Sequence, residues 1–263
     1  MPVLTGNANT GMLLKLACVG VLLLSACAPQ DRCAGLANNL PLVRVLFIGN
    51  SYTYVNDLPG MFRQLACAGG WRVEVAMEAP GGWTLAQHAA SAETTAAIRR
   101  QKWEFVILQE QSEIPASSTR AQVMYPAVRD LVYRITGQGS MPVLFLTWGH
   151  RDGSANSGQG NFKDMQAALT SGYTAIAREM TLPIAPVGPA WQLVVGRDGP
   201  PELWQADGSH PTENGTYLAA CVFYATVFNQ SPEGLDYRAG VEAKTAGILQ
   251  AAAAETVLKG SWR

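Results

Sequence analysis

Charged residues are scarce in this 263-residue sequence, and neither sign of charge dominates. Lys, Arg, Asp and Glu together make up 15% of it, and the formal net charge is −1. This balance excludes bulk electrostatic recruitment of nucleic acid or of an anionic membrane. Hydrophobic residues reach 48%, which excludes a disordered or coiled-coil chain and indicates a substantial core. No Pro/Gly/Ser-rich linker or repeat divides the sequence, so we expect one folded domain.

Histidine and cysteine are also rare. There are three histidines and five cysteines, and none of the cysteines has the spacing of a metal site. We therefore expect neither a metal centre nor a cofactor. If the protein is exported, a disulfide becomes possible, and Cys33 with Cys67 is the first pair to test. Cys221 falls in an apolar helical pattern, where we expect a buried free thiol.

The beginning of the sequence differs in kind from the rest. Lys15 precedes an apolar segment, 16–24, that is too short for a lasting transmembrane anchor and suits a secretory signal. It ends in Leu-Ser-Ala-Cys27, and small residues directly before a cysteine resemble the lipobox of bacterial lipoproteins. The resemblance implies cleavage before Cys27 and a lipid on that cysteine. An ordinary signal peptide with a coincidental cysteine remains the alternative.

These features predict three segments. We expect a lipoprotein signal peptide over residues 1–26, a polar tether over 27–40 and one folded domain over 41–263. The mature protein would then reside in the bacterial cell envelope, attached to a membrane through its lipid, on the periplasmic or the surface side.

Apolar runs alternate with helical periods through the body of the sequence. Strands are predicted at 43–48, 71–76, 103–108, 141–148 and 182–187. Helices are predicted at 57–68, 85–100, 125–135 and 165–180, from 191 onward, and at 212–228 and 241–258. This alternation is typical of a mostly parallel, five-stranded sheet covered on both faces, which is a three-layer α/β/α sandwich.

The first of these strands leads to a candidate nucleophile. Its apolar run stops at Gly49-Asn50, residues that tolerate a sharp turn, and Ser51 follows. The carboxyl end of a central strand is where open α/β sheets bind ligands, so Ser51 can act as a nucleophile if a base reaches it. Taken alone, the same pattern is more often a turn serine that bonds its own backbone.

Three histidines are available as the base. We interpret His88, inside a predicted helix, as a surface or structural residue, whereas His150 follows the fourth strand and is a candidate substrate contact. Asp207 precedes His210 by three residues, and Pro211 restricts the loop behind them. A carboxylate at this spacing can accept a hydrogen bond from the imidazole and orient it. Asp207 and His210 are therefore the predicted orienter and base.

Acyl transfer also needs donors for a developing oxyanion. The backbone N–H groups of Ser51 and Gly82 follow the first two strands, and the amides of Gln109 and Gln111 follow the third. All of them lie at carboxyl ends of strands, so we expect them to converge. We favour Gln109 as the side-chain donor and keep Gln111 as the second choice.

Taken in order, these blocks resemble those of the SGNH (GDSL-type) hydrolases over residues 43–228. The matching residues are Gly49-Asn50-Ser51-Tyr52, Gly82, the amide-bearing turn after the third strand, and Asp207-x-x-His210-Pro211. The resemblance implies the flavodoxin-like fold of that family. It also implies Ser51 as nucleophile, His210 as base, Asp207 as its orienter, and Ser51 with Gly82 as backbone oxyanion donors.

The sequence departs from the family pattern in two places. Asn50 stands where Asp is more frequent, and Gln109-Glu110-Gln111 replaces the usual Gly-x-Asn-Asp of the third block. The glutamine-bearing turn is more similar to sialate-type acetylesterases and to an uncharacterised branch of the family.

The prediction is a serine esterase that hydrolyses a carboxylic ester through an acyl-enzyme on Ser51. An acetyl ester on a carbohydrate is the preferred substrate, by analogy with related branches. A glycan-binding lipoprotein without turnover and an acyltransferase with the same triad remain as alternatives. The oligomeric state is left open.

Overall fold

The structure is a computed structural model that describes residues 1–4, 6 and 31–262 of the chain. The predicted cleavage site and Cys27 lie outside the described residues. Within the described ranges, no helix is both long and apolar enough to cross a membrane. The fold described below belongs to the unit that starts at Asp31.

In the described part of the chain, five strands form one sheet. They are β1 (Leu42–Ile48), β2 (Arg72–Glu78), β3 (Phe105–Leu108), β4 (Met141–Leu146) and β5 (Ile184–Pro186). Their order is β2-β1-β3-β4-β5, and every neighbouring pair is parallel. The five predicted strands are thus confirmed. Because the strand order reverses beside β1, the carboxyl ends of β1 and β3 flank the position where such sheets bind ligands.

Helices connect the strands. They are α1 (Ser51–Tyr54), α2 (Leu58–Ala68), α3 (Leu85–Ala90), α4 (Ala92–Arg99), α5 (Arg120–Thr136), α6 (Phe162–Met180), α7 (Val187–Val195), α8 (Glu213–Phe228) and α9 (Ala243–Leu258), with 3₁₀ turns η1 (Val55–Asp57) and η2 (Ile114–Ala116). The single helix predicted over 85–100 is in fact two. Ser91 is extended between them, and its hydroxyl accepts a hydrogen bond from the Thr94 N–H, so it starts a new helix.

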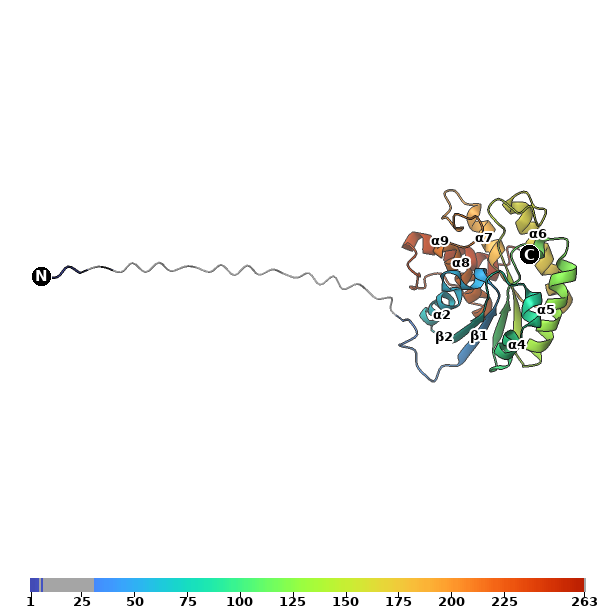
Figure 1. The fold of residues 1–263 in the computed structure, drawn as a ribbon, viewed down its shortest axis with the longest axis horizontal. Helices are drawn as coiled ribbons and strands as arrows, with labels where there is room; N and C mark the ends of the chain where they lie inside the picture. Colours follow the sequence, from blue (N-terminus) through green and yellow to red (C-terminus); the bar gives the residue numbers. More distant parts are fainter. Residues whose placement is uncertain (5, 7–30, 263) are drawn as a thin grey trace. The chain divides into compact units, whose positions relative to one another are not determined.

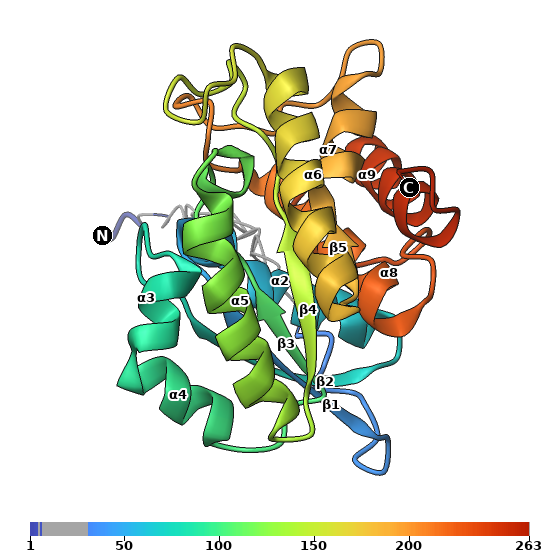
Figure 2. The same cartoon turned by 90° about the vertical axis from the view of Figure 1, so that its right-hand side faces the viewer.

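The sheet is the middle one of three layers (Figure 1). Side chains alternate between the two faces of a strand, so Val45 and Phe47 enter one core while Leu46 and Ile48 enter the other. The first core is closed by α2, α7, α8 and α9, and the second by α3, α4, α5 and α6. Figure 2 shows the second layer, with α5 and α6 in front of the sheet. The predicted α/β/α sandwich is confirmed.

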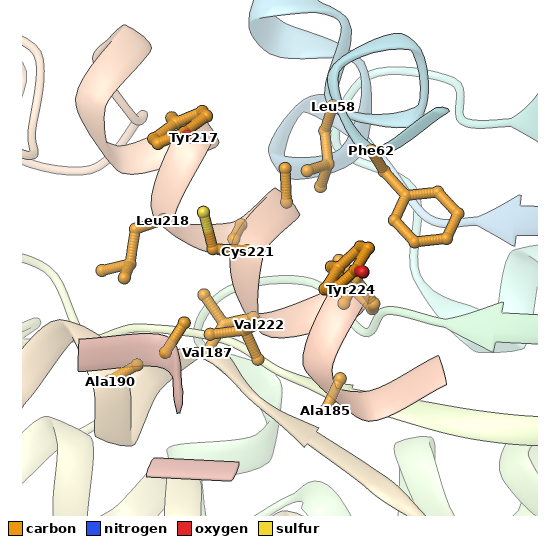
Figure 3. Packing of buried hydrophobic residues seen from close by; sticks show 14 of the residues in the cluster. Leu58, Phe62, Ala185, Val187, Ala190, Tyr217, Leu218, Cys221, Val222 and Tyr224 are labelled. Carbon is orange, nitrogen blue, oxygen red and sulfur yellow. The ribbon is translucent and has the colours of Figure 1, made fainter. Parts of the chain in front are cut away.

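The central helix of the first layer is α8. Its sequence is almost continuously apolar, and its residues from Gly215 to Ala225 are all buried. Figure 3 shows it packed between α2, which contributes Leu58 and Phe62, and α7, which contributes Val187 and Ala190. Cys221 lies in this contact as a buried free thiol, as the sequence predicts. The burial of α8 matters for the site because the helix begins directly behind the loop that carries Asp207 and His210.

A disulfide joins Cys33 to Cys67, with 5.0 Å between their Cα atoms. The segment around Cys33, which the sequence assigns to the tether, makes further contacts with α2. The Arg32 N–H donates to the Gln64 side-chain oxygen at 2.8 Å, and Asp31 lies 3.7 Å from the Arg63 guanidinium. From residue 31 onward, the chain is therefore fastened to the folded body.

We expect the double substitution of Cys33 and Cys67 by serine to lower the free energy of unfolding by about 4 kcal/mol. The bridge closes a loop with a sequence separation of 34, and opening it gives the unfolded chain more conformational freedom. Chemical denaturation with and without reductant measures the effect. Reductant should destabilise the wild-type protein to the level of the variant and leave the variant unchanged. Equal stability of the wild type and the variant without reductant would contradict the prediction.

Candidate active site

The turn after β1 places Ser51 at the first position of α1. The Asn50 side-chain oxygen accepts a hydrogen bond from the Tyr52 N–H at 3.2 Å and so caps the helix. The Ser51 N–H, in the first turn, has no acceptor within the helix. It therefore remains available as a donor beside its own hydroxyl.

Asn50 also connects this turn to the loop after β2. Its amide N–H donates to the Trp83 carbonyl at 2.9 Å. An aspartate could not donate this bond, which gives a physical reason for the asparagine where the family more often has aspartate. The neighbouring Gly82 is exposed and has a φ of 72°, a backbone conformation that favours glycine. The predicted second block is thus tied to the first.

Ser51, His210 and Asp207 form a continuous chain of hydrogen bonds. The Ser51 hydroxyl lies 2.9 Å from His210 Nε2, and His210 Nδ1 lies 2.6 Å from Asp207 Oδ2. The second Asp207 oxygen accepts backbone bonds from Ser209 and His210 at 2.9 and 3.0 Å. Because the carboxylate can only accept, Nδ1 carries a proton and Nε2 is left to accept the serine proton.

The ionisation of Asp207 suits this geometry. Burial alone would raise its pKa, but the hydrogen bond to His210 and the two backbone N–H bonds outweigh burial and lower the pKa to about 2. The carboxylate therefore stays charged at neutral pH, where it holds the imidazole and stabilises its protonated form.

A stack of aromatic rings packs against the loop that carries Asp207 and His210. Tyr52 lies parallel to Trp148 at 4.4 Å, and Trp148 lies parallel to Trp191 at 4.3 Å. The Trp148 indole N–H donates to the Ser209 carbonyl at 2.9 Å, and the Tyr52 hydroxyl lies 2.8 Å from the Ser209 hydroxyl. Trp148 is fully buried, so it is a core residue that positions the triad loop. The sequence analysis placed Tyr52 in the first matching block but predicted no role for the side chain of either Tyr52 or Ser209.

Gln109, the favoured oxyanion donor, has a different task in the structure. It is fully buried, and its side-chain oxygen accepts from the Asn50 N–H at 2.8 Å. Its two amide protons go to the Asn50 side-chain oxygen at 3.0 Å and to the Glu110 carbonyl at 2.5 Å. No proton is left for a substrate, so Gln109 acts on the nucleophile turn instead.

Gln111 lies on the same turn and is only half-buried. Its oxygen accepts from the Glu113 N–H at 2.9 Å, and its amide nitrogen lies 3.2 Å from the Ser112 hydroxyl. One of its two amide protons therefore has no acceptor among the described residues. Gln111, the second choice from the sequence, thus has an amide proton available to donate to a substrate, whereas Gln109 has none.

His150 borders the triad. Its Nε2 lies 3.2 Å from the Ser112 hydroxyl, and the charges of Glu113, Asp207 and His210 all act on its ring. Burial lowers its pKa, although the two acidic groups oppose that effect. Burial thus favours the neutral imidazole of His150 at the edge of the site, and its role as a substrate contact stays a prediction.

His88 is a buried structural residue and not a surface residue. It is fully buried, with Nε2 2.8 Å from the Gly49 carbonyl and Nδ1 2.9 Å from the Thr94 hydroxyl. The carbonyl can only accept, so the proton is on Nε2. Burial lowers the pKa of His88 and favours this neutral form. Of the two interpretations from the sequence, the structural one is right.

Glu110 is a buried carboxyl group that the sequence did not single out. One of its oxygens accepts from the Leu85 and Gln111 N–H groups at 3.0 and 2.7 Å, while the other has no hydrogen-bond partner in the described residues. Burial raises its pKa to about 7, because the two backbone bonds offset only part of the cost of burying the charge. Glu110 thus links the loop before α3 to the turn after β3 as a partly protonated group at neutral pH.

We expect Glu110→Gln to reduce the pH dependence of stability. In the unfolded chain the carboxyl has its ordinary pKa of 4.5, so the wild-type protein loses stability as the pH rises from about 4.5 through about 7. The amide does not titrate and can still accept both backbone bonds. Relative to the wild type, the variant should gain on the order of 3 kcal/mol between pH 4.5 and 8.

Denaturant unfolding at several pH values measures this difference, and Glu233→Gln on the surface is the matched control. The control should follow the wild-type curve. Parallel curves for Glu110→Gln and the wild type would show that Glu110 is not a perturbed group.

Metal binding is not indicated by the described residues. In those ranges, no group of three or more His, Cys, Asp or Glu side chains is arranged to hold an ion.

A solved structure decides the family. A protein from Slackia heliotrinireducens, described as an SGNH hydrolase, is 30% identical to this chain, with a TM-score of 0.61; the match covers 71% of this chain and 100% of that one. The chain belongs to the SGNH hydrolases. No protein-family model matches its sequence, and no curated protein matches it either.

Two more distant structures share the fold of this SGNH hydrolase. A DUF4886 family protein from Bacteroides uniformis matches with a TM-score of 0.69 and 18% identity, over 84% of this chain and 96% of that one. An acetylxylan esterase from Geobacillus stearothermophilus, solved as a catalytic mutant, matches with a TM-score of 0.56 and 15% identity, over 70% and 94%. At these identities the likeness concerns the fold alone.

Proposed function

We propose that the protein is a serine esterase with Ser51 as nucleophile, His210 as base and Asp207 as orienter. The observation that carries the proposal is the unbroken chain of hydrogen bonds from the Ser51 hydroxyl through the His210 ring to Asp207. A serine hydroxyl becomes a useful nucleophile only beside such a base. Membership of the SGNH hydrolases also supports a hydrolase function.

The reaction follows the usual order of acyl transfer. Ser51 attacks the ester carbonyl carbon while its proton moves to His210 Nε2, and Asp207 stabilises the resulting imidazolium. The oxyanion accepts hydrogen bonds from the backbone N–H groups of Ser51 and Gly82, and Gln111 is the candidate for a third donor. His210 then protonates the leaving alcohol, and the same base activates a water that hydrolyses the acyl-enzyme.

An acetyl ester on a carbohydrate is the substrate class we propose. Support comes from the acetylxylan esterase with a similar fold and from the polar groups around the triad, namely Ser112, His150 and Gln111, which suit a hydroxyl-rich alcohol. As a neutral imidazole, His150 can donate a hydrogen bond to such a hydroxyl group or accept one from it.

Export and attachment through a lipid on Cys27 belong to the same proposal. The lipobox-like Leu-Ser-Ala-Cys27 supports it, and so does the disulfide between Cys33 and Cys67, because disulfides are typical of oxidising, extracytoplasmic compartments. A membrane location fits an enzyme that acts on extracellular glycans.

Ser51→Ala should lower the hydrolysis of p-nitrophenyl acetate by roughly three orders of magnitude or more, since the remaining groups cannot form an acyl-enzyme. A spectrophotometric assay measures this, with circular dichroism to check the fold. His210→Ala should lose activity to a similar extent because the two residues act as a unit. Unchanged turnover by folded Ser51→Ala would rule out the proposed nucleophile.

The two alternatives predict different outcomes for the wild-type protein. A glycan-binding protein without chemistry would bind acetylated glycans but show no turnover and no labelling of Ser51 by a fluorophosphonate. An acyltransferase would yield acylated sugar, seen by mass spectrometry, when an acceptor is added.

A further inference from the structure

Ser51 and the Asp207–His210 pair come from segments that lie far apart in the sequence. Contacts outside the triad are therefore needed to hold the two segments together. Ser51 and His210 have a sequence separation of 159, and the contact of the Tyr52 hydroxyl with the Ser209 hydroxyl at 2.8 Å is one connection between their two segments. Asn56, five residues after Ser51, supplies a second connection. Its amide nitrogen donates to the Pro211 carbonyl at 3.0 Å and to the Thr216 hydroxyl at 2.9 Å.

Both acceptors belong to the base side of the site. Pro211 directly follows His210, and its carbonyl also accepts from the Gln205 side chain at 3.0 Å. Thr216 lies in the first turns of α8 and donates its own proton to the Thr212 carbonyl at 3.2 Å, so its oxygen is free to accept from Asn56. The two protons of one amide therefore hold the end of the His210 loop and the start of the helix behind it.

The backbone at Asn56 is unusual. Asn56 has φ 56° and ψ 21°, and Asp57 has φ 53° and ψ 58°. Two consecutive non-glycine residues in the left-handed region are a strained arrangement, which persists where surrounding contacts stabilise it. Asparagine tolerates this region better than most residues. Here it turns the chain from α1 towards α2 while the Asn56 side chain faces Pro211.

We propose that Asn56 is a positioning residue that sets the distance between the Ser51 hydroxyl and His210 Nε2. The inference rests on the proposed function of the triad. The segment from Ser51 to Asn56 is short and contains α1, so a displacement of Asn56 relative to Pro211 displaces Ser51 relative to His210. Misplacement of reacting groups by about 1 Å can cost about 100-fold in rate.

Asn56→Gly is the test variant. Glycine adopts the left-handed conformation without strain, so the relief of strain offsets part of the stability lost with the two hydrogen bonds, while the connection to Pro211 is lost entirely. We expect kcat for p-nitrophenyl acetate to fall about 10- to 100-fold with KM nearly unchanged, and the rate of fluorophosphonate labelling of Ser51 to fall in proportion.

Asn229→Gly is the matched control. Asn229 ends α8 at the side away from the site, is exposed, and also has a left-handed φ of 52°. The control makes the same substitution in the same backbone conformation, so it should leave both kcat and the labelling rate at wild-type values. Thr216→Val, which removes one of the two acceptors and nearly keeps the side-chain shape, should show a smaller loss than Asn56→Gly.

The outcomes separate this inference from the proposed function. If Ser51→Ala is inactive while folded Asn56→Gly has wild-type kcat and labelling rate, the triad stands and the positioning role is wrong. A fall in activity that merely follows a loss of folded protein, seen by circular dichroism and thermal unfolding, also contradicts the positioning role. If Ser51→Ala keeps its turnover, the proposed function itself fails.

Discussion

The hydrogen bonds between Gln109 and Asn50 are the contact on which the site depends. They connect the exits of β1 and β3, the two strands beside the point where the sheet order reverses, and they hold the turn that presents Ser51. This contact demands a very close approach. A Cβ atom at Gly49 would overlap the Gln109 side-chain oxygen and the Thr53 hydroxyl, so a larger residue there would force these side chains out of place. With Gln109 in place, Asn50 is free to cap α1 and to hold the Trp83 loop.

A second set of contacts holds His210, the proposed base, beside Ser51. Tyr52, Trp148 and Trp191 stack beneath the Asp207 loop, and Trp148 fixes the Ser209 carbonyl. Aromatic pairs of this kind add directional preference to the area that they bury. Together with Asn56, they join α1 to the start of α8. The deeply buried α8 gives this loop a rigid support, which keeps His210 beside Ser51 although it lies on a loop.

Three ionisable groups near the site differ in charge because their surroundings differ. Asp207 is partly exposed and accepts three hydrogen bonds, so it stays ionised. Glu110 is buried and accepts only two, so its pKa is raised to about 7. His150 is neutral because burial disfavours its charged form. Asp207 thus provides a fixed negative charge behind the proposed base, while burial favours the neutral forms of Glu110 and His150.

Much of this protein can be predicted from local patterns in its sequence. The strands and most helices follow from apolar periodicity, and Asp207 with His210 follows from a spacing of three residues on one loop. The pairing of Ser51 with that loop followed from the order of the blocks. The strands, the helices and the Asp207–His210 spacing depend on neighbours in the sequence, whereas the pairing with Ser51 was implied by the resemblance to the SGNH hydrolases. The sequence by itself therefore determined the fold class and named the three residues of the proposed triad.

The remaining features depend on residues that only the tertiary structure brings together. The Gln109 amide could donate to an oxyanion, but its two protons go to Asn50, at the end of another strand, and to the Glu110 carbonyl. The raised pKa of Glu110 results from burial, and the connection from Asn56 to Pro211 spans 155 positions. Neither burial nor contact across such separations leaves a local pattern. The tertiary structure therefore decided which polar side chains hold the site and which remain free to act on a substrate.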